Sequence, residues 1–213
     1  MNIKRLMCNP LQENCYVVSD ETKECVIIDC GVYYDEEKQA LATYIASNGL
    51  KPVHLVATHG HLDHNFGNAF VYREYGLKPE ICAEDQNLLV HLREHAATLF
   101  GMNITEDQPP IGCLLKDGDS VTFGQHTLKV LHTPGHSQGS MLLYCEEEQT
   151  VFTGDTLFRM SIGRTDFPES SWAKMEQSLK NVVKQLPKET IVLSGHGPQS
   201  TMADELLYNL YLK

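Results

Sequence analysis

Hydrophobic and polar residues alternate in short runs at the start of the chain, and a period of two predicts β-strands. Three such runs, separated by turn-forming residues, are "IKRLM", "CYVVS" and "CVIID". The continuous apolar run "VHLVAT" predicts a buried strand. Further along, strands are predicted at "PEICA" and then in the runs "DSVTFG", "HTLKVLHT", "MLLYCEE", "TVFTGD" and "TIVLSG".

Apolar residues three or four positions apart predict helices between these strands. The predicted helices span residues 35–49, 65–76, 84–100 and 170–186, and a short one begins at about Ser200. We expect each of the two longest to bury one face. These faces comprise Leu88, Leu92, Ala96 and Leu99 in one helix, and Trp172, Met175, Leu179, Val182 and Leu186 in the other.

Length and charge narrow the class of protein. A chain of 213 residues is most simply one large domain, residues 1–213. The net charge of −11 argues against a nucleic-acid surface, because phosphate contacts need clustered Lys and Arg. No segment is apolar over enough residues to form a signal peptide or span a bilayer, so we expect no membrane association and a cytoplasmic location. Seven cysteines without a Cys-x-x-Cys pair fit reduced thiols there.

The stretch "ATHGHLDHNFG" places His59, His61, Asp63 and His64 within six consecutive positions, directly after an apolar run. The simplest alternative is that these side chains only decorate a turn. Neutral imidazole together with carboxylate is, however, the ligand set of zinc, iron or manganese. The motif therefore indicates a metal site, provided that further ligands come from elsewhere in the chain.

Three other apolar runs are also followed at once by a turn that carries His or Asp. The stretches "LKVLHTPGH", "TVFTGD" and "TIVLSGHG" add His136, Asp155 and His196. Loops that leave rigid strand ends can aim polar side chains into a shared cleft. Tetrahedral zinc takes four ligands, and a catalytic site keeps one position for water. Seven candidate ligands therefore suit two metal ions that share a carboxylate and a bridging hydroxide.

A helical insertion at about residues 84–112 separates the first two ligand loops. It consists of the predicted helix and the breaker-rich stretch "GMNITEDQPPIG". We expect it to border the cleft and to shape a substrate pocket, with residues such as Phe100 and Met102 available for contact.

The order and spacing of these motifs resemble those of the metallo-β-lactamase-fold hydrolases. The resemblance runs from "NCYVV" and "VIIDCG" through "THGHLDH", "TPGHSQGS" and "TGDTLF" to "SGHGP". It implies an α/β fold, a four-layer αββα sandwich that holds the metals at one edge between its two sheets. It also implies a first metal on His59, His61 and His136, a second on Asp63, His64 and His196, and Asp155 as the bridge.

Within that family, "TGDTLFRMSIGRTDFP" is most similar to the glyoxalase II-like branch, the hydroxyacylglutathione hydrolases and their short bacterial relatives. The resemblance implies hydrolysis of a small-molecule thioester by a metal-activated hydroxide, with zinc as the expected metal and iron or manganese as alternatives. Asp63 would orient the hydroxide as the catalytic residue. Asp29 would hold the histidine loop, or it is an ordinary turn residue. Arg164 would bind a substrate carboxylate, or it forms a structural salt bridge.

Departures from the branch bear on glutathione specificity. Full-length glyoxalase II continues into a helical domain that supplies basic contacts to glutathione, whereas 17 residues follow His196 here. Pro198 stands where the larger enzymes carry a Tyr, and Cys30 stands where the family usually shows Pro.

Several alternative functions stay open. The nearest is a persulfide dioxygenase of the same fold, which uses one iron held by two His and one Asp. A lactonase, a phosphodiesterase, a ribonuclease or a non-catalytic metal-binding protein on this scaffold are the others. The stretch "HLREH", residues 91–95, also fits an inverzincin protease pattern, or it is a helix over the mouth of the site with exposed His91 and His95. His54, His126 and His132 are interpreted as ordinary packed or surface histidines.

Overall fold

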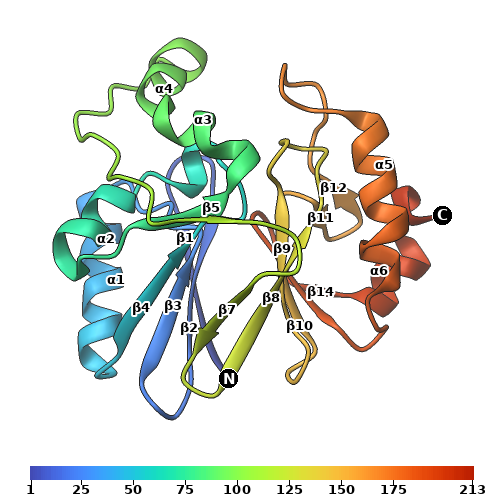
Figure 1. Ribbon diagram of the computed structural model, residues 1–213, viewed down its shortest axis with the longest axis horizontal. Helices are drawn as coiled ribbons and strands as arrows, with labels where there is room; N and C mark the ends of the chain where they lie inside the picture. Colours follow the sequence, from blue (N-terminus) through green and yellow to red (C-terminus); the bar gives the residue numbers. More distant parts are fainter.

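Two six-stranded β-sheets pack face to face, and helices cover both outer faces, as Figure 1 shows. The structure is a computed structural model that describes residues 1–213, with the side chains of all but Leu99 and Phe100. The α/β fold class and the αββα layers that the resemblance implies are confirmed.

The first sheet has the strand order β1-β2-β3-β4-β5-β6. Its strands are β1 (Asn2–Cys8), β2 (Glu13–Ser19), β3 (Glu24–Ile28), β4 (Lys51–Val56), β5 (Pro79–Cys82) and β6 (Cys113–Leu115). Strands β1 to β3 pair antiparallel, and β3 to β6 pair parallel. Helices α1 (Asp35–Ser47) and α2 (Asn68–Tyr75) cover its outer face.

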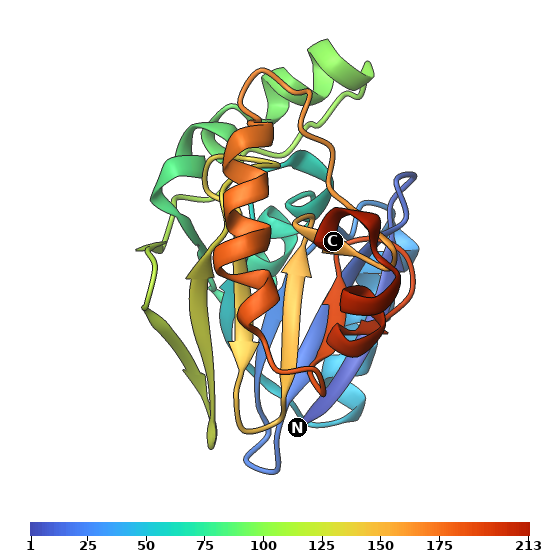
Figure 2. The same ribbon diagram turned by 90° about the vertical axis from the view of Figure 1, so that its right-hand side faces the viewer.

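The second sheet has the order β14-β13-β10-β9-β8-β7. Its strands are β7 (Ser120–Phe123), β8 (His126–His132), β9 (Met141–Cys145), β10 (Thr150–Gly154), β13 (Ile191–Ser194) and β14 (Ser200–Thr201). Figure 2 shows α5 (Trp172–Asn181) lying across this sheet, with α6 (Met202–Tyr208) beside it. A two-stranded ribbon, β11 (Leu157–Phe158) and β12 (Ser161–Ile162), completes the strands.

Packing on both faces explains why the central strands are continuous apolar runs in the sequence. In β3, Val26 and Ile28 face the second sheet, whereas Cys25 and Ile27 face the helices of the outer layer. Both faces of the strand are therefore buried, which removes the polar positions that a half-exposed strand would carry. On the opposite sheet, the inner face includes Phe123, Leu128, Val130, Met141, Leu143 and Phe152.

Helices α3 (Gln86–Val90) and α4 (Leu92–Phe100) correct the prediction of one helix over residues 84–100. His91 lies between them with φ −96° and ψ 17°, which interrupts the helix. The buried side chains are Leu89, Leu92 and Ala96, while the predicted Leu88 is half-buried because the break shifts the register. The predicted Leu99 lies outside the described side chains.

The predicted helix over residues 170–186 is also shorter than expected. Helix α5 ends at Asn181, and a 3₁₀ turn follows at Val183–Gln185. This change of pitch buries Val183 in place of the predicted Val182, and Trp172 is 48% exposed rather than buried. The other 3₁₀ turns are Leu62–His64, Ala83–Asp85 and Leu210–Leu212.

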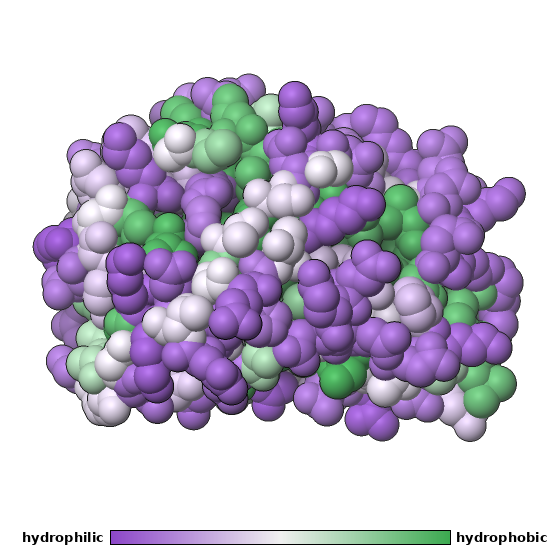
Figure 3. All heavy atoms as spheres, turned by 60° about the horizontal axis from the view of Figure 1, so that its bottom comes forward, coloured by the Kyte–Doolittle hydropathy of each residue, from purple (hydrophilic) through white to green (hydrophobic). Residues whose placement is uncertain are grey.

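The lower face of the molecule is predominantly polar. Figure 3, which brings the lower end of Figure 1 forward, shows hydrophilic residues over most of that face, with hydrophobic residues in separate small groups. In the described chain, no helix combines the length and apolarity needed to cross a membrane. All seven cysteines are free, and Cys113 is the exposed one.

Asp85 ties α3 to two of the ligand loops. Its side chain is fully buried at the start of α3. One oxygen accepts hydrogen bonds from the backbone N–H of Gly60 (2.8 Å) and from the Ser137 hydroxyl (2.6 Å), and the other accepts from the N–H of Gly139 (2.6 Å). Gly60 belongs to the first loop, and Ser137 and Gly139 belong to the second. One carboxylate therefore fixes the spacing between loops of different sheets.

Replacing this carboxylate by an amide tests that role. Asp85→Asn keeps the size but turns an NH₂ group toward donors, so we expect a loss of about 3 kcal/mol in the free energy of unfolding. For a chain of this length that corresponds to a fall of roughly 6–12 °C in Tm, measured by thermal denaturation. Asp35→Asn, the same change on an exposed side chain, is the matched control. An unchanged Tm for Asp85→Asn would show that the hydrogen bonds of Asp85 to the two loops do not stabilise the fold.

His54 connects the two sheets at a second place. Its Nδ1 lies 2.6 Å from Glu80 on β5, and its Nε2 lies 3.0 Å from the carbonyl oxygen of Thr122 on β7. The hydrogen bond to Glu80 raises the pKa of His54 above its ordinary value, against the lowering effect of burial. This histidine is therefore packed between sheets rather than free at the surface.

The raised pKa predicts a pH-dependent contribution to stability. A group whose pKa is higher in the folded chain stabilises it fully below its unfolded pKa, about 6.5, and loses that effect as pH rises through the folded value. The Tm difference between wild type and His54→Gln should therefore be largest below pH 6.5 and shrink above it. Exposed His91→Gln is the control. A difference that stays constant from pH 5 to pH 9 would contradict this assignment.

Candidate metal centre

Four strands end at the same edge of the sandwich, and a predicted ligand loop leaves each of them. Strand β4 is followed by His59, His61, Asp63 and His64, the last two within the 3₁₀ turn Leu62–His64. Strands β8, β10 and β13 run parallel to one another in the second sheet and are followed by His136, Asp155 and His196. The fold thus brings all seven predicted ligands together.

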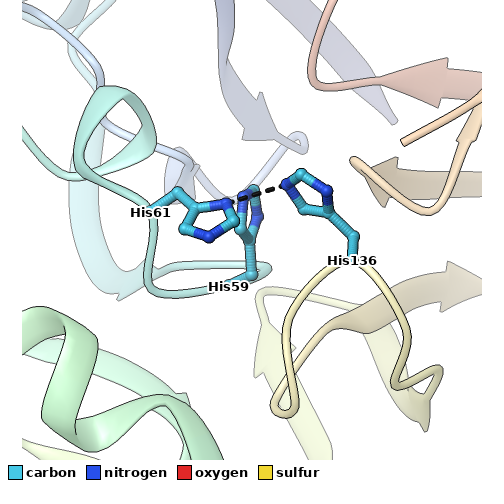
Figure 4. A group of neighbouring side chains, drawn as sticks. All are labelled: His59, His61 and His136. Carbon is cyan, nitrogen blue, oxygen red and sulfur yellow. Dashed lines mark hydrogen bonds between the residues drawn. The ribbon is translucent and has the colours of Figure 1, made fainter. Parts of the chain in front are cut away.

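The first group of ligands is a triad of imidazoles. Figure 4 shows the rings of His59, His61 and His136 converging from two loops. His61 Nδ1 lies 2.8 Å from His136 Nε2, and the potential ligand atoms of the three residues all lie within 4.8 Å of one another. Such a cluster can hold one metal ion through three nitrogen ligands.

The second group combines imidazoles and carboxylates. Asp63, His64 and His196 form one triad, in which Asp63 Oδ2 lies 3.1 Å from His196 Nε2 and 3.7 Å from His64 Nε2. Asp155 lies between the two groups. Its Oδ1 is 3.4 Å from His64 Nε2, and its Oδ2 is 3.4 Å from His136 Nε2. This carboxylate reaches both triads, as the bridging position requires.

Three of the converging atoms are buried without a hydrogen-bond partner: His59 Nε2, His64 Nε2 and Asp155 Oδ1. A buried polar atom without a partner is costly, and a cation at the centre of each triad would satisfy these atoms. All of the donors are imidazole nitrogens or carboxylate oxygens, the set that zinc, iron and manganese accept. The residues therefore fit divalent metal ions.

At its other ring nitrogen, each of the five histidines lies beside a polar group, which is a hydrogen-bond partner for all except His64, whose Nδ1 lies within ion-pair distance of Asp29. Such partners fix the tautomer and the orientation of a metal-ligating imidazole. They are Thr58 Oγ1 for His59 (3.1 Å), Glu169 for His61 (3.0 Å), Asp29 for His64 (3.1 Å), the Arg164 carbonyl for His136 (2.9 Å) and the Leu11 carbonyl for His196 (3.1 Å). The other nitrogen of each ring faces the centre.

Burial and charge set the protonation of the cluster. Burial, aided by the neighbouring His64, lowers the pKa of His59 well below its ordinary value, so this imidazole is neutral and can donate a lone pair. Burial raises the pKa of Asp155, but the surrounding histidines, His64 first, outweigh it and lower that pKa well below its usual range. For His64 itself, burial lowers the pKa, and the carboxylates of Asp63 and Asp155 more than reverse the effect.

Asp29 combines the two roles that the sequence left open. Its backbone has a φ of 52°, a left-handed turn conformation. Its side chain accepts hydrogen bonds from the N–H of Thr58 (2.6 Å) and from the Thr58 hydroxyl (2.8 Å), directly before the histidine loop. Together with its approach to His64, these bonds place Asp29 behind the ligands as the support of that loop.

The side chain of Arg164 does not enter the site. It is exposed, forms a bidentate salt bridge to Asp166 (2.6 and 2.7 Å), and lies 4.4 Å over the ring of Phe167. The structure thus shows the salt-bridge alternative. The backbone of Arg164, rather than its guanidinium, contacts the ligand His136.

Sequence reasoning missed several buried supports. Asn65 donates to the carbonyl oxygens of His59 (3.0 Å) and His61 (2.8 Å), and Asn9 donates to that of Asp63 (2.9 Å). Glu13 is fully buried, and its carboxyl lies 4.0 Å from His64 Nδ1. Asn65, which directly follows the candidate ligand His64 in "LDHN", had a signal in the sequence, whereas Asn9 and Glu13 are far from every candidate ligand along the chain.

The "HLREH" stretch lacks the geometry of a protease site. His91 is exposed and pairs with Glu94 on its own helix (3.1 Å), and the rings of His91 and His95 are 6.5 Å apart. Among the described side chains, no carboxylate from a distant helix joins them in a three-ligand cluster. His95 is half-buried rather than exposed, so the surface interpretation holds for His91 alone.

Comparison with known proteins places this geometry in a family. The sequence model of the Metallo-beta-lactamase superfamily matches residues 8–196, a range that includes all seven candidate ligands. Hydroxyacylglutathione hydrolase GloC of Haemophilus influenzae is 29% identical over 212 residues, which cover 100% of this chain and 98% of that protein.

Two solved structures are similar over their full lengths, each with 35% sequence identity to this chain. The BLEG-1 B3 metallo-beta-lactamase has a TM-score of 0.89, with 100% of both chains covered. TTHA1623, solved in a di-iron-bound form, has a TM-score of 0.86, with 98% of this chain and 100% of that chain covered. The match to the family, the shared fold and the four ligand loops at one sheet edge lead to one conclusion: the chain belongs to the metallo-β-lactamase superfamily.

Proposed function

We propose that the protein is a metal-dependent hydrolase of the glyoxalase II-like kind, which cleaves a small-molecule thioester with two divalent metal ions. The observation that carries the proposal is the pair of triads joined by Asp155, with Asp63 beside them. The name of the Haemophilus influenzae relative, a hydroxyacylglutathione hydrolase, supports the thioester class. The net charge of −11 disfavours nucleic acid as the substrate.

In this proposal, His59, His61 and His136 hold one metal, Asp63, His64 and His196 hold the other, and Asp155 contacts both. When bound, such ions lower the pKa of water toward neutrality and polarise a carbonyl oxygen. The di-iron form of TTHA1623 supports a two-metal site on a chain of this kind. Zinc, iron and manganese all fit the donor set.

Asp63 is the residue that we assign to the chemistry. Its contacts with His64 and His196 are both made through Oδ2, which leaves Oδ1 able to accept a hydrogen bond from a water in the site. Burial raises the pKa of Asp63, but the interactions with His64 and His196 outweigh it, so the group is a carboxylate at neutral pH. An ionised acceptor in this place orients the attacking water toward the substrate carbonyl.

The leaving group explains the lack of a further assigned acid. A thiolate is stable enough to depart without protonation by a strong general acid, in contrast to an amine. The site therefore needs an oriented water, a polarised carbonyl and a bound substrate arm. Asp63 orients the water, and the shape of the site binds the substrate arm.

Metal content is the first test. We expect about two metal ions per purified chain, measured by elemental analysis. His196→Ala should leave about one ion, because the imidazole triad is intact, whereas Asp155→Ala should weaken both sites. Exposed His91→Ala is the control and should keep two. A single iron in the wild type that also survives in His196→Ala would favour the dioxygenase instead.

Turnover is the second test. S-lactoylglutathione and shorter thioesters are assayed beside glutathione persulfide in an oxygen electrode. We expect thioester hydrolysis without oxygen uptake, and a fall in kcat of about 100-fold or more for Asp63→Asn with a small change in KM, because orientation acts in the transition state. Metal content is measured on the same samples to separate orientation from ligation. Oxygen uptake with inert thioesters would sink the hydrolase proposal.

A further inference from the structure

A cavity of about 300 Å³ opens directly beside the candidate metal centre. Its walls come from α3 and α4 on one side and from residues 167–169 on the other, and its floor includes the ligands His61 and Asp63. In Figure 1, α3 and α4 stand above the first sheet at the upper edge, opposite the segment that leads into α5. A larger hollow between β1 and α1 contains none of the candidate ligands.

The lining is mainly apolar. Five hydrophobic side chains form most of it: Leu62, Leu88, Leu92, Phe167 and Pro168. The hydroxyl of Thr98 also lines it, but it donates to the Glu94 carbonyl of its own helix (2.7 Å). The volume is at the lower end of small-molecule pockets, so it suits a short chain rather than a peptide-sized group.

The charged groups at this cavity are acidic. Asp63 and Glu169 line it, and neither Lys nor Arg does so among the described side chains. His95 is the remaining ionisable side chain besides His61. A substrate carboxylate placed against this lining would lose its hydration without gaining a Lys or Arg partner from it, which is unfavourable.

Two cations close in sequence to residues 167–169 are already engaged. Arg164 is bound to Asp166 and lies against Phe167, and Lys174 is hydrogen-bonded to Gln138. Glutathione carries two carboxylates, so a site built for it would be expected to offer a free cation near the cavity. Where such a cation would be expected, the cavity is lined by leucine side chains.

We propose that this cavity binds a short, uncharged apolar arm of the substrate, and that Leu88 and Leu92 make the enzyme prefer thioesters with such an arm over glutathione thioesters. The inference rests on the proposed thioester hydrolysis and specifies its substrate class. An acyl chain and an alkyl thiol present the same chemistry to the lining, and two substrate series distinguish them.

Of the two residues that the sequence suggested for this pocket, only Met102 can be compared with the structure. Met102 does not line this cavity; it packs against the hydrophobic cluster that contains Leu89 and Leu92. Phe100 lies outside the described side chains. The half-buried Leu88, exposed to the cavity by the break at His91, is the position best placed for a test.

The experiment measures kcat/KM on the metal-loaded protein. One series lengthens the acyl chain from acetyl to hexanoyl on N-acetylcysteamine, an uncharged thiol. The other keeps a lactoyl group and varies the thiol from ethanethiol to pentanethiol, with glutathione for comparison. In the series whose arm enters the cavity, kcat/KM should rise about fourfold per added methylene until the cavity is full, and glutathione should be the poorer thiol. A flat response in both series would overturn the inference.

Two matched variants locate the effect. Leu88→Lys places a cation in the cavity and should abolish the gain per methylene, while raising the rate with a succinyl thioester relative to a butanoyl thioester by about tenfold or more. Val90→Lys makes a similar charge change at an exposed position of the same helix and should keep the wild-type preference. Equal behaviour of the two variants would show that α3 does not set specificity.

Binding separates this inference from the proposed reaction. Calorimetry on the metal-loaded protein compares 1-butanethiol with 3-mercaptopropionate, which differ chiefly in the carboxylate. We expect butanethiol to bind about tenfold more tightly, and Leu88→Lys to reverse the order. If butanethiol binds more tightly but no thioester is hydrolysed, the proposed reaction is wrong, and the proposal that the cavity binds an apolar arm is supported. If thioesters are hydrolysed but the two probes bind equally, the cavity inference falls alone.

Discussion

The gathering of seven ionisable side chains at one edge, five of them buried, is the constraint on which the structure depends. Imidazoles and carboxylates that leave water lose hydration, and this loss is recovered only when opposite charges, hydrogen bonds or a cation replace the water. Here His64 stands among carboxylates, His59 is neutral, and Asp155 stands among histidines. His59 Nε2, His64 Nε2 and Asp155 Oδ1 have no hydrogen-bond partner within the chain, and the cations of the proposed site would satisfy them.

That requirement explains how the rest of the fold is organised. The two sheets serve to bring four strand ends to one edge, and each sheet supplies ligands and the groups that orient them. Asp85 links this framework to α3, because the carboxylate that spaces the two loops stands at the start of the helix that carries Leu88. The wall of the apolar cavity is therefore anchored to the ligand loops. Its position relative to the centre is set by hydrogen bonds rather than by loose packing.

The sequence predicted the parts of this protein that have a local signature. The central strands follow from continuous apolar runs, because both faces of each strand are covered, and the ligand loops follow from the polar turns behind them. Short elements such as β6 and β14 lacked enough residues to show a period. The break at His91 lies within an unbroken helical pattern, so tertiary packing decides it. The sequence did not predict the roles of Asp85 and Glu169, because their partners are distant along the chain. In the sequence alone, a buried acidic residue cannot be distinguished from a solvent-exposed one.

The division of the candidate ligands between the two sheets has a consequence for metal loading in the proposed two-metal site. Four ligands follow β4 in the first sheet, and the other three come from the second sheet. An ion bound between them joins the two halves of the chain, much as a cross-link would. The first loop alone offers only part of either triad, so a partly synthesised chain lacks a finished binding site. In the proposed two-metal site, loading would therefore follow the docking of the sheets, and an ion would have to be released before the halves could separate.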